Sequence, residues 1–121
     1  MHPNESREDY LEAILILSNE KEEIHAIDLC NQLGFSKPSV SIALKKLISD
    51  GTIYIDESHH IHLTESGLKI ANNVFERHVI LKEAFISLGI SEDIAIEDAC
   101  RVEHDLSDES FEAIKNHFNN K

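Results

Sequence analysis

The sequence has no tryptophan and is poor in cysteine and proline, with two residues of each among 121. Cys30 and Cys100 are too few for a disulfide framework and lie in helix-like patterns, which favours a reducing, cytoplasmic setting. No apolar run approaches the roughly 20 residues that a bilayer span needs, and no basic head precedes an apolar stretch at the N-terminus. We therefore expect neither a membrane segment nor a secretory signal, and one compact unit or two small subdomains.

Positive charge is also scarce, since 11 basic residues stand against 23 acidic ones and the net charge is −12. This balance argues against nucleic-acid binding, because phosphate contacts need Lys and Arg. However, the 21 residues between Asp28 and Asp50 contain no acid and carry Lys37, Lys45 and Lys46. This window predicts a contact face in an otherwise acidic chain. The excess acid elsewhere is either solvated surface or a place where cations bind.

Apolar residues recur at helical spacing along most of the chain. Gly34 is typical of a helix C-terminus, and Ser36 with Pro38 is typical of the first turn of the next helix. Two helices joined by a turn of about three residues form a helix-turn-helix, and a hairpin directly after them forms a wing. The predicted elements are helices over 6–19, 26–33, 36–50, 64–88, 91–105 and 107–118, with strands over 52–55 and 61–64. The fold class is therefore mainly α.

In a helix-turn-helix the second helix enters the major groove, and its N-terminal residues meet base edges. Val40, Leu44 and Leu47 are expected to face the core, which leaves hydroxyls and lysines outside. An ordinary helical hairpin with a solvated lysine face is the alternative, and the acidic wing tip at 56–60 weakens the DNA interpretation. The candidate DNA-binding residues are Ser36, Lys37, Pro38, Ser39, Ser41, Ile42, Lys45 and Lys46.

Oxygen, nitrogen and sulfur donors together suit a first-row transition metal. Cys100, Glu103 and His104 are spaced as neighbours on one helical face. The first helix offers a carboxylate pair one turn apart, and the long helix offers a histidine. The sequence leaves open whether the three groups meet, and each alone also fits a solvated or core side chain. The candidate metal ligands are Asp9, Glu12, His78, Cys100, Glu103 and His104. A rival donor cluster lies in the wing, at Asp56, Glu57, His59, His60 and His62.

Several segments, in the same order, resemble the diphtheria toxin repressor and manganese transport regulator family over nearly the whole chain. They are residues 8–12, 36–41, 77–78 and, most specifically, Ala-Cys-Arg-Val-Glu-His-Asp-Leu-Ser at 99–107. The resemblance implies a homodimer in which Mn(II) or Fe(II) tightens binding to operator DNA of metal-homeostasis genes, without an organic cofactor. It implies a winged helix-turn-helix DNA-binding domain at 1–72 and a helical metal-binding and dimerisation domain at 73–121. We expect the short two-domain form, without the SH3-like domain of larger members.

The resemblance also implies a hybrid metal site. The first-helix carboxylates are similar to those of manganese-type members, whereas Cys100 resembles iron-type members. Hard carboxylates suit Mn(II), while a thiolate raises the affinity for Fe(II), Co(II) or Zn(II). Lys82 and Ile96 stand where iron-type members carry a carboxylate and a histidine, which leaves their ancillary site open. Ile42 occupies a recognition position where a polar residue is common.

We expect the metal ion to control DNA binding through electrostatics. Without metal, Asp9, Glu12 and Glu103 repel one another, and a divalent ion would neutralise them and set the recognition helices of a dimer about one DNA turn apart.

The alternatives are a metal-independent winged-helix regulator and a thiol-dependent enzyme with Cys100 as nucleophile and His104 as base. For the enzyme, the sequence lacks an oxyanion-forming loop. The dimer is expected to use apolar residues of the last helices: Phe85, Ile86, Leu88, Ile90, Ile94, Phe111, Ile114 and Phe118.

Overall fold

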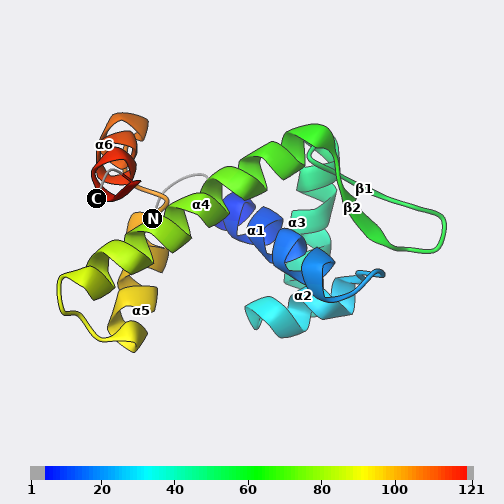
Figure 1. Cartoon of the computed structure of the whole chain (residues 1–121). Coiled ribbons are helices and arrows are strands. Elements are labelled where there is room, and N and C mark those ends of the chain that lie inside the picture. Colours follow the sequence, from blue (N-terminus) through cyan, green and yellow to red (C-terminus); the bar gives the residue numbers. More distant parts are fainter. Residues whose placement is uncertain (1–4, 120–121) are drawn as a thin grey trace. The chain divides into compact units, whose positions relative to one another are not determined.

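The computed structural model describes residues 5–119, which form six helices and one antiparallel hairpin (Figure 1). The elements are α1 (Glu5–Glu20), α2 (Ala26–Leu33), α3 (Lys37–Ser49), β1 (Ile53–Ile55), β2 (Ile61–Leu63), α4 (Glu65–Ser87), α5 (Glu92–Val102) and α6 (Asp108–Asn119). Two compact units meet between Asn72 and Asn73, inside α4. The predicted fold class, mainly α with a winged helix-turn-helix followed by a helical domain, is confirmed. In this range no helix combines the length and the apolar character that crossing a bilayer requires.

Two caps fix the turn between α2 and α3. Gly34 adopts a left-handed backbone with φ 72°, and its N–H donates to the carbonyl of Cys30 at 2.9 Å. Ser36 caps α3 by accepting the N–H of Ser39 at 3.3 Å. Pro38 lies in the first turn, where a helix needs no N–H. Both caps fall at the residues that the sequence predicts.

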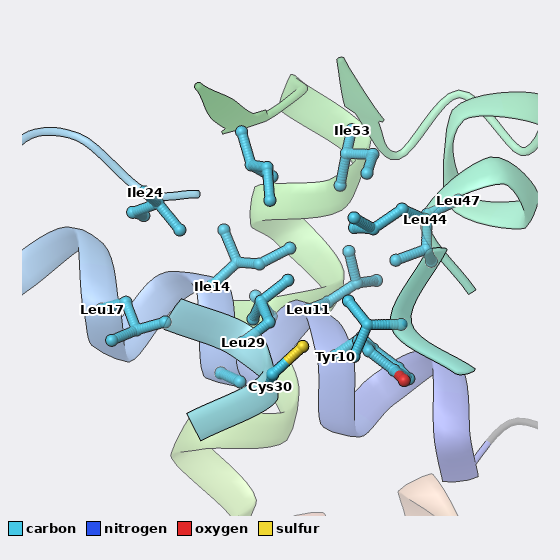
Figure 2. Packing of buried hydrophobic residues seen from close by; sticks show 14 residues of the cluster. Tyr10, Leu11, Ile14, Leu17, Ile24, Leu29, Cys30, Leu44, Leu47 and Ile53 are labelled. Atoms are coloured by element: carbon cyan, nitrogen blue, oxygen red, sulfur yellow. The ribbon is translucent and has the colours of Figure 1, made fainter. Parts of the chain in front are cut away.

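Apolar side chains from α1, α2, α3 and the hairpin form the core of the winged unit (Figure 2). On α1, Tyr10, Ile14 and Leu17 recur every three or four residues and are at most 6% exposed. Leu11 and Leu29 are fully buried, and the burial of each stabilises the fold by about 1.5–3 kcal/mol. The side of α3 that faces this core is the predicted one, formed by Val40, Leu44 and Leu47.

One carboxylate orders the tip of the wing. β1 and β2 pair antiparallel, and the loop between them begins at Asp56. One oxygen of Asp56 accepts the N–H groups of Ser58 and His60 at 2.9 and 3.0 Å, and the other lies 2.8 Å from His62 Nε2. The hydrogen bond with His62, followed by that with the His60 main chain, lowers the pKa of Asp56 to about 2. The tip therefore keeps this negative charge at neutral pH.

Two expectations for the helical unit are wrong. α5 ends at Val102 rather than near residue 105, so Glu103 is its C-cap and His104 lies in the following turn. Phe111, expected on a dimer surface, is only 2% exposed within the protomer. Both differences arise at Arg77, whose guanidinium lies 5.1 Å from the ring centre of Phe111 and donates to the turn after α5.

Gly67 marks a close backbone approach between the start of α4 and the residue before β1. A Cβ atom at this position would lie 1.9 Å from the carbonyl oxygen of Thr52, which accepts the N–H of Thr64 at 3.0 Å. The Thr52 hydroxyl in turn donates to the carbonyl of Leu47 at 3.1 Å. The crossing that joins α3, the hairpin and α4 therefore requires glycine.

Gly67→Ala is expected to destabilise the protein by about 2 kcal/mol or more, because the added methyl group collides with fixed backbone. Urea unfolding followed by circular dichroism measures the change. Lys69→Ala, an exposed substitution on the same turn of α4, is the control and should stay within about 0.5 kcal/mol of the wild type. Equal stability of the two variants would contradict the close approach.

Candidate functional site

Three side chains of the helical unit, each with a different donor atom, converge on one point. His78 comes from α4, Cys100 from the last turn of α5, and Glu103 from the residue that caps α5. Their ligand atoms lie within 4.8 Å of one another. His78 Nδ1 is 3.0 Å from Glu103 Oε2 and 3.7 Å from Cys100 Sγ. Helical spacing predicts that Cys100 and Glu103 are neighbours, whereas the sequence leaves their meeting with His78 open.

The carboxylate of Glu103 is the centre of this cluster. The Glu103 side chain is 1% exposed, and its Oε1 lies 3.4 Å from Nε2 of His104, whose side chain is 2% exposed. Oε2 faces His78. A buried carboxylate is costly unless it is paired, so the imidazoles on its two sides stabilise its charge. A divalent cation would stabilise the same charge.

The neighbours of His78 set its charge. Hydrogen bonds of Nδ1 with the Cys100 sulfur and the Glu103 carboxylate raise the pKa of His78 to about 10, against the opposing effect of partial burial. The imidazole therefore carries a positive charge between a thiol and a carboxylate. A metal ion at this point would displace the proton and find nitrogen, sulfur and oxygen ligands together.

Arg77 fixes the main chain of Glu103. Its guanidinium donates to the carbonyl oxygens of Glu103 at 3.0 Å and Leu106 at 2.5 Å, and it pairs with the carboxylate of Asp108 at the start of α6. The carbonyls at the end of a helix lack intrahelical partners. Because the arginine supplies partners beyond α5, the helix stops at Val102 and the turn at 103–107 is held in place.

Sequence reasoning misses this role of Arg77, although a signal for it exists. Val74, Arg77 and Leu81 follow helical spacing on α4, and all three are buried. An arginine on the apolar side of a helix needs acceptors, because a buried charge without partners is strongly unfavourable. Its position in the helical pattern therefore marks it as an organising residue, but the pattern does not identify the acceptors.

The other predicted ligands belong to the winged unit. Asp9 and Glu12 lie one turn apart on α1, and both are half-buried. They stay predicted ligands. Lys82 is half-buried and Ile96 is 37% exposed, and neither side chain offers a metal donor where iron-type members carry one.

The rival donor cluster in the wing is used differently. Asp56 Oδ2 lies 2.8 Å from His62 Nε2 and 3.6 Å from His60 Nδ1. Within residues 5–119, however, the wing donors are not among the groups whose ligand atoms converge within 4.8 Å. The hydrogen bonds of Asp56 order the hairpin loop instead.

The predicted DNA-contact residues lie on the exposed side of α3 and at its N-cap. The helix carries no acidic side chain, and its N-cap hydroxyl, that of Ser36, donates to the hydroxyl of Ser39 at 3.1 Å. Between α2, α3 and the wing lies a hollow of about 610 Å³, partly lined by Lys37, Ser41 and Lys45. The exposed residues are Ser36, Lys37, Pro38, Ser39, Ser41, Ile42, Lys45 and Lys46.

These features define a class of protein in which a winged helix-turn-helix unit precedes a helical unit with a metal-type donor cluster. Residues 4–63 match the iron dependent repressor N-terminal DNA binding domain. Residues 64–120 match the iron dependent repressor metal binding and dimerisation domain. The chain belongs to the iron-dependent repressor family.

Individual relatives agree with this assignment. The transcriptional regulator MntR of Escherichia coli O6:H1 is 36% identical over 114 residues, which cover 94% of this chain and 74% of that protein. The structure of the manganese regulator SloR matches with a TM-score of 0.84 at 29% identity, over 100% of this chain and 56% of that one. A manganese-dependent transcriptional repressor in complex with manganese matches with a TM-score of 0.83 at 25% identity, over 93% and 52%. The chain thus spans about half the length of these two solved proteins.

Arg77→Met is expected to destabilise the metal-free protein by about 2–4 kcal/mol, because it leaves buried carbonyls without a donor. Thermal unfolding measures the loss, and hydrogen exchange should show faster exchange at residues 103–108. Arg101→Met is the matched control, since Arg101 is 71% exposed and forms surface ion pairs with Glu97 and Asp98. It should cost less than about 1 kcal/mol. Similar losses in both variants would contradict the organising role of Arg77.

Proposed function

We propose that the protein is a cytoplasmic, homodimeric transcriptional repressor that binds operator DNA of metal-homeostasis genes when it holds Mn(II) or Fe(II). The observation that carries the proposal is the convergence of imidazole, thiol and carboxylate at Glu103, in a chain of the iron-dependent repressor family. The similarity to a manganese regulator and to a manganese-dependent repressor supports the same activity.

The donors of the helical unit fit a divalent first-row ion. Carboxylate and imidazole suit Mn(II) and Fe(II), while the thiolate of Cys100 adds affinity for Fe(II), Co(II) and Zn(II). A bound ion supplies positive charge among carboxylates that otherwise repel one another. The proposed ligands are His78, Cys100, Glu103 and His104, joined by Asp9 and Glu12 on the strength of the sequence pattern.

We assign DNA binding to residues 1–72 and metal binding with dimerisation to residues 73–121. α3 would enter the major groove, because its outward side lacks acid and presents lysines and hydroxyls. An acidic chain needs such a separate surface to approach phosphate. The base-contacting residues are proposed from Ser36, Lys37, Pro38, Ser39, Ser41 and Ile42, with Lys45 and Lys46 on phosphates.

The homodimer would use exposed apolar residues of α4 and α5 and of the turn between them. Ile86, Leu88 and Ile94 are 41%, 75% and 49% exposed, and exposed apolar residues that gather on one surface mark protein–protein contacts. Phe111 is excluded from this surface by its burial, but the remaining residues of the expected set are retained. Two protomers would place two recognition helices on one operator.

Two alternatives are less well supported. A metal-independent winged-helix regulator gives no reason to bury the Glu103 carboxylate between two histidines. An enzyme with Cys100 as nucleophile and His104 as base fits the geometry poorly, because the Cys100 sulfur lies beside His78 whereas His104 lies beside Glu103. The family, moreover, is one of repressors with DNA-binding and metal-binding domains.

The deciding experiment compares DNA binding with and without metal after treatment with a chelator. Fluorescence anisotropy on the DNA upstream of the protein's own gene, at fixed salt, should show at least about tenfold tighter binding with Mn(II) or Fe(II). Glu103→Gln should abolish this enhancement while the protein stays folded, because it removes the central carboxylate charge. The control Glu109→Gln, exposed on α6, should respond like the wild type. An undiminished metal response in Glu103→Gln would refute the proposed site.

Co(II) can report directly on Cys100. A thiolate bound to Co(II) gives a charge-transfer absorption in the near ultraviolet, which the wild type and Cys30→Ser should show and Cys100→Ser should lack. Replacing the soft ligand by a hard one, in Cys100→Asp, should shift the preference from Zn(II) towards Mn(II). An absorption that survives in Cys100→Ser would remove Cys100 from the ligand set.

A further inference from the structure

Helix α3 presents an aliphatic side chain where it faces away from the core. With about 3.6 residues per turn, Ile42 lies nearly opposite the buried stripe of Val40, Leu44 and Leu47. Ile42 is 66% exposed, against 46% for Ile48 further along the same helix. The core therefore does not account for an apolar residue at this position. A binding partner that packs against the exposed side of α3 would account for the apolar side chain.

α3 also lacks the side chains that read most bases through paired hydrogen bonds. Its 13 residues include no Asn, Gln, Asp or Glu, which are the usual partners of adenine and cytosine, and no Arg, so that only Lys is left to pair with guanine. The hydroxyls of Ser36 and Ser39 are hydrogen-bonded to each other, and that of Ser36 also caps the helix. The lysines can contact phosphates or pair with guanine, but neither contact reads thymine. Polar readout by α3 is therefore limited.

We propose that Ile42 determines operator specificity by packing on the C5-methyl group of a thymine in the major groove. The inference rests on the proposed function, since it requires α3 to enter that groove. Among the four bases only thymine presents a methyl group there, and apolar contact is the readout that an aliphatic side chain can make. Ile42 stands on the outward side of α3, which a groove about 12 Å wide can admit.

The proposed contact predicts both a change in affinity and a base preference. Burying one methyl group against an aliphatic side chain strengthens binding about fourfold, and a two-fold symmetric dimer makes the contact once in each half-site. The operator should therefore carry thymine at one fixed position of each half-site. Deoxyuridine at that position removes the methyl group and keeps every hydrogen-bonding group of the base.

The first arm of the test finds the position. The full chain, loaded with Mn(II) or Fe(II), is used to select from a pool of DNA duplexes with a randomised centre, and the bound sequences are read. Ile48→Ala is the matched control for Ile42→Ala, because it makes the same change on the same helix at a residue that lines the hollow beside the wing. Wild type and Ile48→Ala should select thymine at one position of each half-site, and Ile42→Ala should lose that preference.

The second arm measures the methyl group itself. Wild type and Ile48→Ala should bind the deoxyuridine duplex about fourfold more weakly per half-site, in anisotropy at fixed salt, while Ile42→Ala binds both duplexes equally. Equal binding of both duplexes by the wild type overturns the inference and leaves the proposed function standing. If Ile42→Ala still binds the deoxyuridine duplex more weakly than the thymine duplex, the inference is likewise overturned and the proposed function stands. If no sequence is enriched with either metal, the proposed function fails and takes the inference with it.

Discussion

The helical unit is organised around one costly group, the buried carboxylate of Glu103. An anion held away from water needs partners, and His78 and His104 supply them for its two oxygens. Arg77, next to His78 on α4, holds the main chain of the same residue. One turn of α4 thus positions Glu103 twice, through its side chain and through its carbonyl. The early end of α5 and the burial of Phe111 follow from the same arginine.

Charge separation is the second constraint, since a chain of net charge −12 can approach DNA only through a surface that excludes acid. α3 is such a surface, and its position depends on the packing of its buried side against α1, α2 and the hairpin. A metal ion among the carboxylates would reduce the repulsion between the rest of the protein and phosphate. The acid-free surface of α3 and the positive charge of a bound metal ion would therefore both favour DNA binding.

Local patterns predict most of the architecture, because caps and apolar spacing act within a few residues. Gly34, Ser36 and the buried side of α3 are examples in which the structure agrees with the sequence. His78 and Cys100 are 22 residues apart in the sequence, and their convergence depends on the packing of α4 against α5. No rule that acts within a few residues predicts this contact. The end of α5 is misjudged for the same reason, since the acceptors of Arg77 come from a different part of the chain. The order of the wing tip is also absent from the sequence pattern, because it depends on one side chain, that of Asp56, which accepts the N–H groups of Ser58 and His60.

The anionic wing tip has a consequence for the ionic part of DNA recognition. Asp56 stays ionised at neutral pH because its hydrogen bonds hold its pKa at about 2, so the tip contributes little to counterion release. In a repressor built this way the lysines of α3 carry most of the phosphate contacts, and their number is small. The affinity would then fall with salt less steeply than that of regulators with basic wings. Discrimination between operator and bulk DNA would rest correspondingly more on the fit of α3 to the bases.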